Sequence, residues 1–200
     1  MKYNKYSFQK YVYPDRWISY WHQIDATLRL TPENVLVVGK GDGIVVDILK
    51  KYIPRVESLD TEEKLEPDIV ASVENMPLPD KSFDVVLAAE ILEHLPFDKF
   101  KTSLSEIRRV AKKGSVISLP HRGYTFSLSF KIPLIKWKRF IIKIPHFWKT
   151  KTSTPEHYWE LGMKGYSKKT IKKIIYETGF KIKTSFVKHD DPSHIFLILT

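Results

Sequence analysis

The chain has 200 residues, of which 42% are hydrophobic and 13% aromatic, so it can form the buried core of a domain. This composition excludes a wholly disordered chain, and the absence of cysteine excludes disulfides, thiol catalysis and cysteine-ligated zinc. No apolar run approaches the ~18 residues of a membrane span, and the N-terminal stretch lacks the apolar segment of a signal peptide. We therefore expect a soluble, cytoplasmic protein.

The net charge of +10 is concentrated in one segment of the chain. No acidic residue occurs between Glu106 and Glu156, and the remainder of the chain has 21 basic and 23 acidic residues. A basic segment attracts nucleic acid, anionic lipid or an anionic metabolite, and charge alone does not choose among them. The segment contains twelve basic residues: Arg108, Arg109, Lys112, Lys113, Arg122, Lys131, Lys136, Lys138, Arg139, Lys143, Lys149 and Lys151.

Apolar runs and helical patterns alternate along the first 120 residues. Asp15 is placed to cap a helix that runs to about Leu30. This alternation predicts a doubly wound, Rossmann-like α/β sheet, mostly parallel, with helices on both faces. The expected strands are 34–39, 56–60, 69–72, 83–89 and 114–120, and the expected helices between them are 44–51 and 98–111.

The C-terminal part of the chain returns to regular patterns after an interruption. Ser167 is a suitable N-cap for a helix over 168–178, which Gly179 ends. Strands over 180–187 and 194–199 flank a turn-forming segment, which predicts an antiparallel hairpin. We expect a single domain over 1–200, with an N-terminal helical cap over 1–30 and a basic aromatic insert, a substrate lid, over 121–156.

A glycine-rich loop, Gly39-Lys40-Gly41-Asp42-Gly43, lies between the first expected strand and the next helix. Glycines there let a ligand approach the backbone closely, and the helix N-terminus favours anionic or polar groups. Asp60 ends the following strand, where a carboxylate can accept hydrogen bonds from ribose hydroxyls. The combination indicates a cofactor that contains a nucleoside.

Four segments, in order, resemble the class I S-adenosylmethionine-dependent methyltransferases, and within them the small "methyltransferase domain" proteins of type 11. The first is Val35-Leu-Val-Val-Gly-Lys-Gly-Asp-Gly43, and the second is the end of the next expected strand, where Asp60 matches the family's ribose-binding acidic residue. The third runs from Asn75 to Leu95 and reads NMPLPDKSFDVVLAAEILEHL, and the fourth runs from Ile107 to Pro120 and reads IRRVAKKGSVISLP. The resemblance covers residues 34–120 well and 157–200 more loosely.

The resemblance implies a seven-stranded sheet with a C-terminal antiparallel hairpin, and S-adenosylmethionine as cofactor. It implies methyl transfer to an oxygen or nitrogen of a small-molecule, glycan-precursor or lipid-linked acceptor. The chain departs from the family pattern at Val37 and Ser72, where an acidic residue is usual. The implied cofactor-binding residues are Val38, Gly39, Lys40, Gly41, Gly43, Asp60, Thr61, Ser72, Val73 and Glu90.

Candidates for acid–base catalysis follow the fourth and fifth strands and the insert. Glu90, His94 and His121 lie near the expected carboxyl ends of the strands. If their segment forms a helical turn, His157 and Glu160 fall on one face of it, with Tyr158 and Trp159 beside them. This combination would hold a base over a ring-shaped or planar acceptor. A zinc site of His157, Glu160 and another histidine has no second ligand pair at metal spacing, so we expect no metal.

The insert leaves several interpretations open. Its Phe, Trp and Lys content suits an anionic small molecule, a lipid-linked acceptor at a membrane surface, or RNA. It also fits a hydrophobic helical cap with a solvated lysine face. The alternative function is a catalytically degenerate methyltransferase-fold module that binds nucleic acid or anionic membrane through the insert. An NAD-binding Rossmann domain is the third option, but its motif requires glycine at Ile44.

Overall fold

The computed structural model describes residues 6, 8–131, 133 and 137–200. Residues 1–5 and 7 of the expected N-terminal cap, and Lys136 of the basic segment, lie outside the described residues. The strands are β1 (Asn34–Val38), β2 (Arg55–Asp60), β3 (Ile69–Val70), β4 (Phe83–Ala89), β5 (Ala111–Pro120), β6 (Gly123–Phe130), β7 (Lys138–Pro145), β8 (Ile182–Phe186) and β9 (His194–Leu199). The α-helices are α1 (Phe8–Tyr11), α2 (Pro14–Leu28), α3 (Ile44–Leu49), α4 (Phe100–Val110) and α5 (Lys168–Glu177), and the 3₁₀ turns include η2 (Glu63–Leu65), η3 (Leu92–His94) and η4 (Phe97–Lys99).

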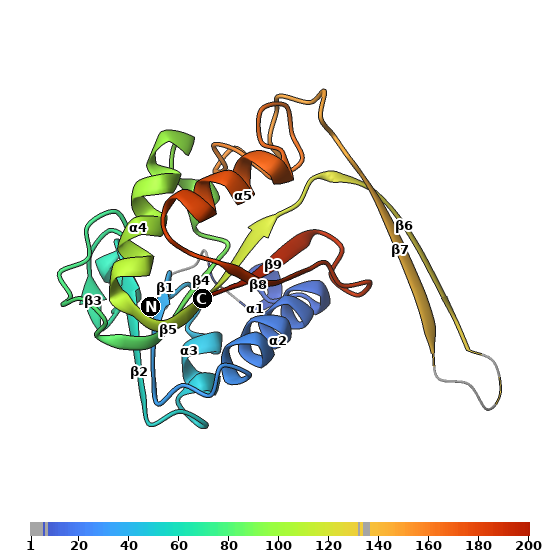
Figure 1. The fold of residues 1–200 in the computed structure, drawn as a ribbon. Helices are drawn as coiled ribbons and strands as arrows, with labels where there is room; N and C mark the ends of the chain where they lie inside the picture. The colour runs from blue at the N-terminus through green and yellow to red at the C-terminus, as the bar shows by residue number, and fades with distance from the viewer. Residues whose placement is uncertain (1–5, 7, 132, 134–136) are drawn as a thin grey trace.

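A seven-stranded sheet in the order β3-β2-β1-β4-β5-β9-β8 forms the centre of the molecule (Figure 1). The first five strands in this order are parallel, and β9 pairs antiparallel with both β5 and β8. The chain passes from β1 to β2 on one side and reaches β4 on the other side, so the strand order reverses between β1 and β4. Ligands of doubly wound sheets bind at such a reversal, beyond the carboxyl ends of the strands.

The two faces of the sheet are covered by different helices (Figure 1). Side chains alternate along β1, so Val35 and Val37 pack with residues of α2 and α3. Leu36 and Val38 pack with residues of α4 and α5 on the opposite face. The continuous apolar run of β1 is therefore explained by burial on both sides, as is usual for a central parallel strand. None of the helices in the described ranges is both long and apolar enough to cross a bilayer.

Most of the elements expected from the sequence are confirmed. Ser167 accepts a hydrogen bond from the Thr170 N–H at the start of α5, and Gly179 has a φ of +83° after its end. The expectation for Asp15 was wrong. Helix α2 begins at Pro14 with Tyr13 as its N-cap, because proline fits the first turn and lacks the N–H that a cap would bind.

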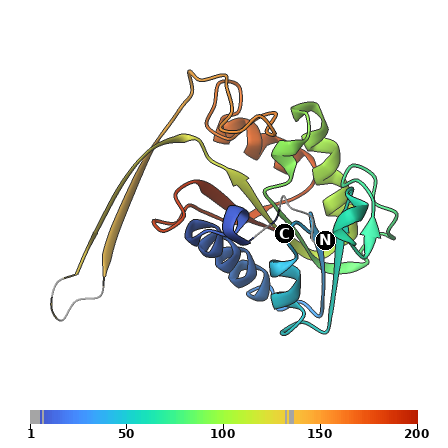
Figure 2. The ribbon, with the colours of Figure 1, turned by 180° about the vertical axis from the view of Figure 1, so that it is seen from behind.

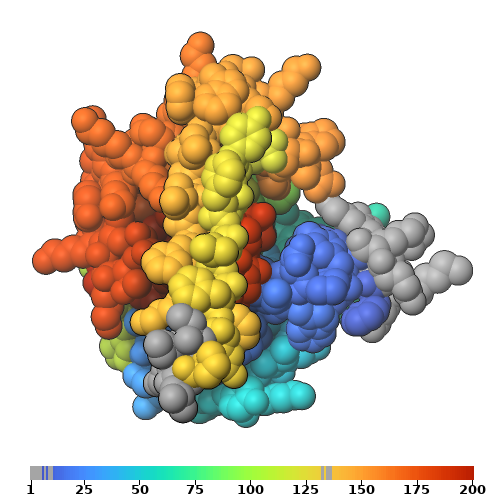
Figure 3. All heavy atoms as spheres, turned by 90° about the vertical axis from the view of Figure 1, so that its right-hand side faces the viewer, coloured from blue at the N-terminus to red at the C-terminus, as the bar shows by residue number. Residues whose placement is uncertain are grey.

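The insert forms an antiparallel hairpin, β6 and β7, with Gly123 opposite Pro145 and Phe130 opposite Lys138. The helical-cap interpretation of the insert was therefore wrong. The two strands and the residues next to them, which we call the arm (residues 123–131 and 137–145), project away from the sheet, as Figures 1 and 2 show from opposite sides. Seen from the side from which the arm projects, its yellow and orange strands lie in front of the rest of the molecule (Figure 3).

Candidate functional site

A cleft of about 910 Å³ lies beyond the carboxyl ends of the parallel strands, at the reversal of strand order. The loop after β1, the end of β2, the segment after β3 and the end of β4 line one part of it. Residues after β5, the base of the arm and the turn before β9 line the other part. The cleft thus joins the expected cofactor region to the expected acceptor region.

The glycine loop is fixed against the end of β2. The carboxylate of Asp60 accepts a hydrogen bond from the Lys40 N–H at 2.8 Å and one from the Glu62 N–H at 3.0 Å. Gly39 has a φ of +83°, and its N–H donates to the Leu59 carbonyl at 2.7 Å. A Cβ on Gly39 would lie 2.0 Å from Ile91 Cδ1, so the loop requires glycine for both its conformation and its packing.

Nine of the ten expected cofactor residues line this cleft, since Gly43 does not. Gly43 is instead the N-cap of α3, with a φ of +82°. Val37 also lines the cleft and is buried, so the wall at this position is apolar where a carboxylate was the family expectation. The Ser72 hydroxyl accepts a hydrogen bond from the Glu74 N–H at 3.2 Å, which fixes the turn beside the cleft.

These residues fit a nucleoside-containing cofactor. Asp60 presents a carboxylate beside a glycine loop, and no atom of the described residues outside the loop itself lies within 4 Å of the position that a Cβ on Gly41 would take. Tyr20 donates from its hydroxyl to Asp42 Oδ2 at 2.7 Å and brings α2 over the loop. In the same helix His22 is also buried, whereas Trp17 and Trp21 are exposed.

Glu90 begins the acceptor side of the cleft at the end of β4. It has a φ of +53°, and non-glycine residues held in this conformation cluster at functional sites. Its carboxylate accepts a hydrogen bond from Ser118 Oγ at 2.7 Å and pairs with His194 Nε2 at 3.3 Å. His194 lines the cleft together with Glu90.

His194 lies between two carboxylates, because its Nδ1 also contacts Asp191 Oδ1 at 2.6 Å. Burial lowers the pKa of His194, but Glu90 and Asp191 outweigh this effect and raise it to about 9. His194 is therefore an imidazolium at neutral pH. The adjacency follows from the antiparallel pairing of β9 with β5, which places His194 opposite Pro120.

His121 and Lys143 lie where the arm meets the cleft. Burial, together with the charges of Lys143 and Lys168, lowers the pKa of His121 to about 3, so its ring is neutral. Burial also lowers the pKa of Lys143 to about 8, and its ammonium donates to the Pro192 carbonyl. The cleft is lined here by His121, Arg122, Gly123, Thr125 and Lys143.

His157 and Glu160 meet, although their segment is not helical. His157 Nδ1 lies 2.7 Å from Glu160 Oε1, and Arg122 Nε lies 3.0 Å from Glu160 Oε2. Glu160 is buried behind His157 and does not line the cleft. Trp159 packs in the core against Phe97 and Phe100, so the interpretation that it lies over an acceptor was wrong.

Glu93 and His94 follow β4 in η3, and His157 reaches them from the segment after the arm. One ligating atom from each of the three side chains lies within 4.8 Å of the others. Burial and the charge of Glu90 raise the pKa of Glu93 well above its ordinary value. Burial and His157 lower the pKa of His94. Glu93 was not among the catalytic candidates, since nothing in the sequence places it opposite a residue 64 positions away.

The sheet order and the position of the cleft define a doubly wound, Rossmann-like α/β fold. The N-methyltransferase NodS from Bradyrhizobium japonicum WM9, solved in complex with S-adenosyl-L-homocysteine, superposes with a TM-score of 0.62 at 12% identity, covering 98% of this chain and 92% of that one. The PH0226 protein from Pyrococcus horikoshii OT3 also has a TM-score of 0.62, at 13% identity, covering 99% of this chain and 95% of that one. At these identities the likeness establishes the fold.

Residues 36–119 match the family model described as "Methyltransferase domain". A probable S-adenosylmethionine-dependent methyltransferase of Mycolicibacterium smegmatis is 33% identical over 118 residues. This match covers 53% of the chain and 45% of the relative, so it spans less than half the length of that protein.

Proposed function

We propose that the protein binds S-adenosylmethionine in the cleft and transfers its methyl group to an oxygen or nitrogen of an acceptor. The hydrogen bond from the Lys40 N–H to Asp60 carries this proposal, because it fixes a carboxylate beside a glycine loop where the ribose of the cofactor is expected. The family model that residues 36–119 match and the described function of the Mycolicibacterium relative support the same cofactor.

When bound, S-adenosylmethionine supplies a methyl group on a sulfonium, and the protein has to align the acceptor with it. We assign proton removal from the acceptor to Glu90, whose carboxylate is held at the end of β4 by Ser118 and His194. Glu90→Gln is expected to keep the affinity for S-adenosylhomocysteine within about threefold and to lower the transfer rate by about 10²-fold or more. A large loss of affinity instead would assign Glu90 to cofactor binding.

The arm supports a lipid-linked acceptor at an anionic membrane surface. Residues paired across the hairpin share a face, so one face is apolar and exposed from Tyr124 to Phe130, with Lys138 opposite Phe130 at its end. A patch of this kind marks an interaction surface. The apolar face consists of Tyr124, Phe126, Leu128, Phe130, Phe140, Ile142 and Ile144.

Charge and side-chain type favour a bilayer over the other partners. Exposed Lys131, Lys138 and Arg139 lie toward the end of the arm, where cations attract anionic headgroups. The stretch between Glu106 and Glu156 has no acidic residue, so two arms brought together would repel each other. Leu128, Ile142 and Ile144 separate the aromatic side chains of the face and cannot stack on bases, which disfavours a continuous stacking surface for single-stranded RNA.

Flotation with vesicles of zwitterionic lipid, with and without anionic lipid, tests the arm. We expect the intact protein to float with anionic vesicles, and Phe126→Ser with Ile142→Ser to reduce flotation at least fivefold. Tyr52→Ser is the matched control, since Tyr52 is 67% exposed but lies outside the arm. Absence of flotation, or RNA binding lost equally in the arm variant, would contradict a membrane role.

Incubation with S-adenosylmethionine that carries a labelled methyl group tests the transfer itself. We expect label in lipid-extractable material when membrane fractions are supplied, and an initial rate of labelling lower by about 10²-fold or more with Glu90→Gln. S-adenosylhomocysteine binding without any transfer to membrane or soluble fractions would favour the catalytically degenerate alternative.

A further inference from the structure

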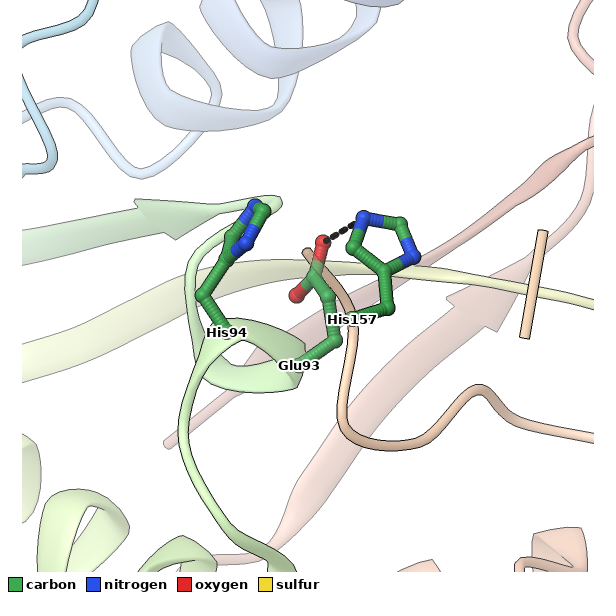
Figure 4. Close-up of side chains that lie close together, drawn as sticks. All are labelled: Glu93, His94 and His157. Carbon is green, nitrogen blue, oxygen red and sulfur yellow. Dashed lines mark ion pairs between the residues drawn. The ribbon is translucent and has the colours of Figure 1, made fainter. Parts of the chain in front are cut away.

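Three side chains with metal-ligating atoms converge in the wall of the cleft. One ring nitrogen each from His94 and His157 and one oxygen of Glu93 lie within 4.8 Å of one another. In Figure 4 the Glu93 carboxylate lies between the two rings. The two segments are held together by the Tyr158 N–H, which donates to the Glu93 carbonyl at 2.8 Å.

Both histidines are oriented through their Nδ1 atoms. His157 Nδ1 lies 2.7 Å from Glu160 Oε1, and His94 Nδ1 lies 3.1 Å from the Glu156 carbonyl oxygen. Both partners accept, so each neutral ring carries its proton on Nδ1 and keeps the lone pair of Nε2 for a ligand. A carboxylate or carbonyl behind an imidazole is the arrangement that supports a metal-bound histidine.

The Glu93 carboxylate has no hydrogen-bond partner in the part of the chain that the structure describes, and the side chain is fully buried. His157 Nε2, at 4.0 Å from Oε1, is its cationic neighbour when that ring is protonated. A buried carboxylate without partners is costly, and a bound cation would remove that cost.

We propose that Glu93, His94 and His157 form a site for a divalent transition-metal ion of the Zn²⁺ type. Two imidazoles and one carboxylate suit Zn²⁺ and related ions, whereas Mg²⁺ and Ca²⁺ prefer oxygen ligands. Metal–ligand distances of about 2.0–2.2 Å place ligand atoms about 3.4 Å apart, so the three side chains would close slightly around the ion.

The coordination would remain open toward the cleft, because His94 and His157 both line it. An oxygen of the acceptor could then complete the coordination and be held beside Glu90. This last step rests on the proposed methyl transfer, whereas metal binding itself does not.

Titration of the chelator-treated intact protein with Zn²⁺, and with Co²⁺ followed by visible absorption, tests the site. We expect one ion per chain, and at least tenfold weaker binding for Glu93→Gln and for His157→Ala. His189→Ala is the matched control and is expected to stay within twofold, since His189 lies outside the cleft lining. S-adenosylhomocysteine binding to the metal-free protein is measured in parallel, so that failure of the two proposals is distinguishable.

If the variants do not fold, the unaltered protein is modified with diethylpyrocarbonate with and without Zn²⁺, and the modified histidines are mapped by mass spectrometry. Zn²⁺ should protect His94 and His157 of the unaltered protein and leave His189 reactive. Absence of one-to-one binding, equal binding by Glu93→Gln and His189→Ala, or protection confined to other histidines would overturn the proposal.

Discussion

Asp60 at the end of β2 accepts a hydrogen bond from the Lys40 N–H in the loop after β1, at 2.8 Å. The two residues are 20 positions apart, and the parallel pairing of β1 with β2 brings them to the same edge of the sheet. One carboxylate oxygen thus fixes the glycine loop. The other accepts from the Glu62 N–H, so the conformation of the loop and the direction of the carboxylate are set together.

Replacing Gly39 by alanine is expected to weaken S-adenosylhomocysteine binding at least tenfold and to lower the free energy of unfolding by about 1–3 kcal/mol. The new Cβ would meet the Ile91 side chain, and the φ of +83° is unfavourable for alanine. Gly165→Ala is the control, because Gly165 has a φ of +90° and, within the described part of the chain, no neighbouring atom within 4 Å of its Cβ position. Calorimetry and urea unfolding that fail to separate the two variants would contradict this role of the loop.

The charged His194 makes stability depend on pH. Its pKa of about 9 is raised above the unfolded value of about 6.5, so its contribution is complete below pH ~6.5 and is lost as pH rises through 9. We expect the unaltered protein to lose about 2–3 kcal/mol of unfolding free energy over this range relative to His194→Gln. Lys143, with its pKa lowered to about 8, acts in the opposite direction in both proteins. If the free energy of unfolding changed with pH in the same way in both proteins, a charged His194 would be contradicted.

Arg109 ties the loop after β3 to α4. Its guanidinium donates to the Met76 and Leu78 carbonyls and to the carboxylates of Glu106 and Asp80. Arg109→Ala leaves these acceptors unpaired, and we expect a loss of about 2–3 kcal/mol in urea unfolding. Exposed Lys112 is the control for charge, and Lys112→Ala is expected to change stability by less than about 0.5 kcal/mol. A loss for Arg109→Ala no larger than that would show that the loop does not need this anchor.

The sequence predicts the fold best where the burial of a strand determines its pattern of apolar residues. Strands β1 and β4 are buried on both faces, and their short apolar runs could be recognised for that reason. The arm was missed even though Tyr124, Phe126, Leu128 and Phe130 alternate with small polar residues. Alternation normally indicates a face packed on a core, and the apolar face of the arm is exposed instead.

The site likewise has a part that the sequence predicts and a part that it does not. The glycine loop and Asp60 lie in one strand–helix–strand unit, so local spacing was sufficient to place them together. The contact of Glu93 with His157 depends on where the chain returns to the sheet after the arm. The contact of Glu90 with His194 depends on the antiparallel pairing of β9 with β5. Spacing along the sequence does not encode either contact.

The central claim is that the cleft binds S-adenosylmethionine through the glycine loop and Asp60, and calorimetric titration with S-adenosylhomocysteine tests it most directly. We predict one site per chain in the intact protein. Asp60→Ala should weaken binding at least tenfold, whereas Asp98→Ala, which removes an exposed aspartate in η4, should leave it unchanged. No binding to the intact protein, or equal binding by the two variants, would contradict the account.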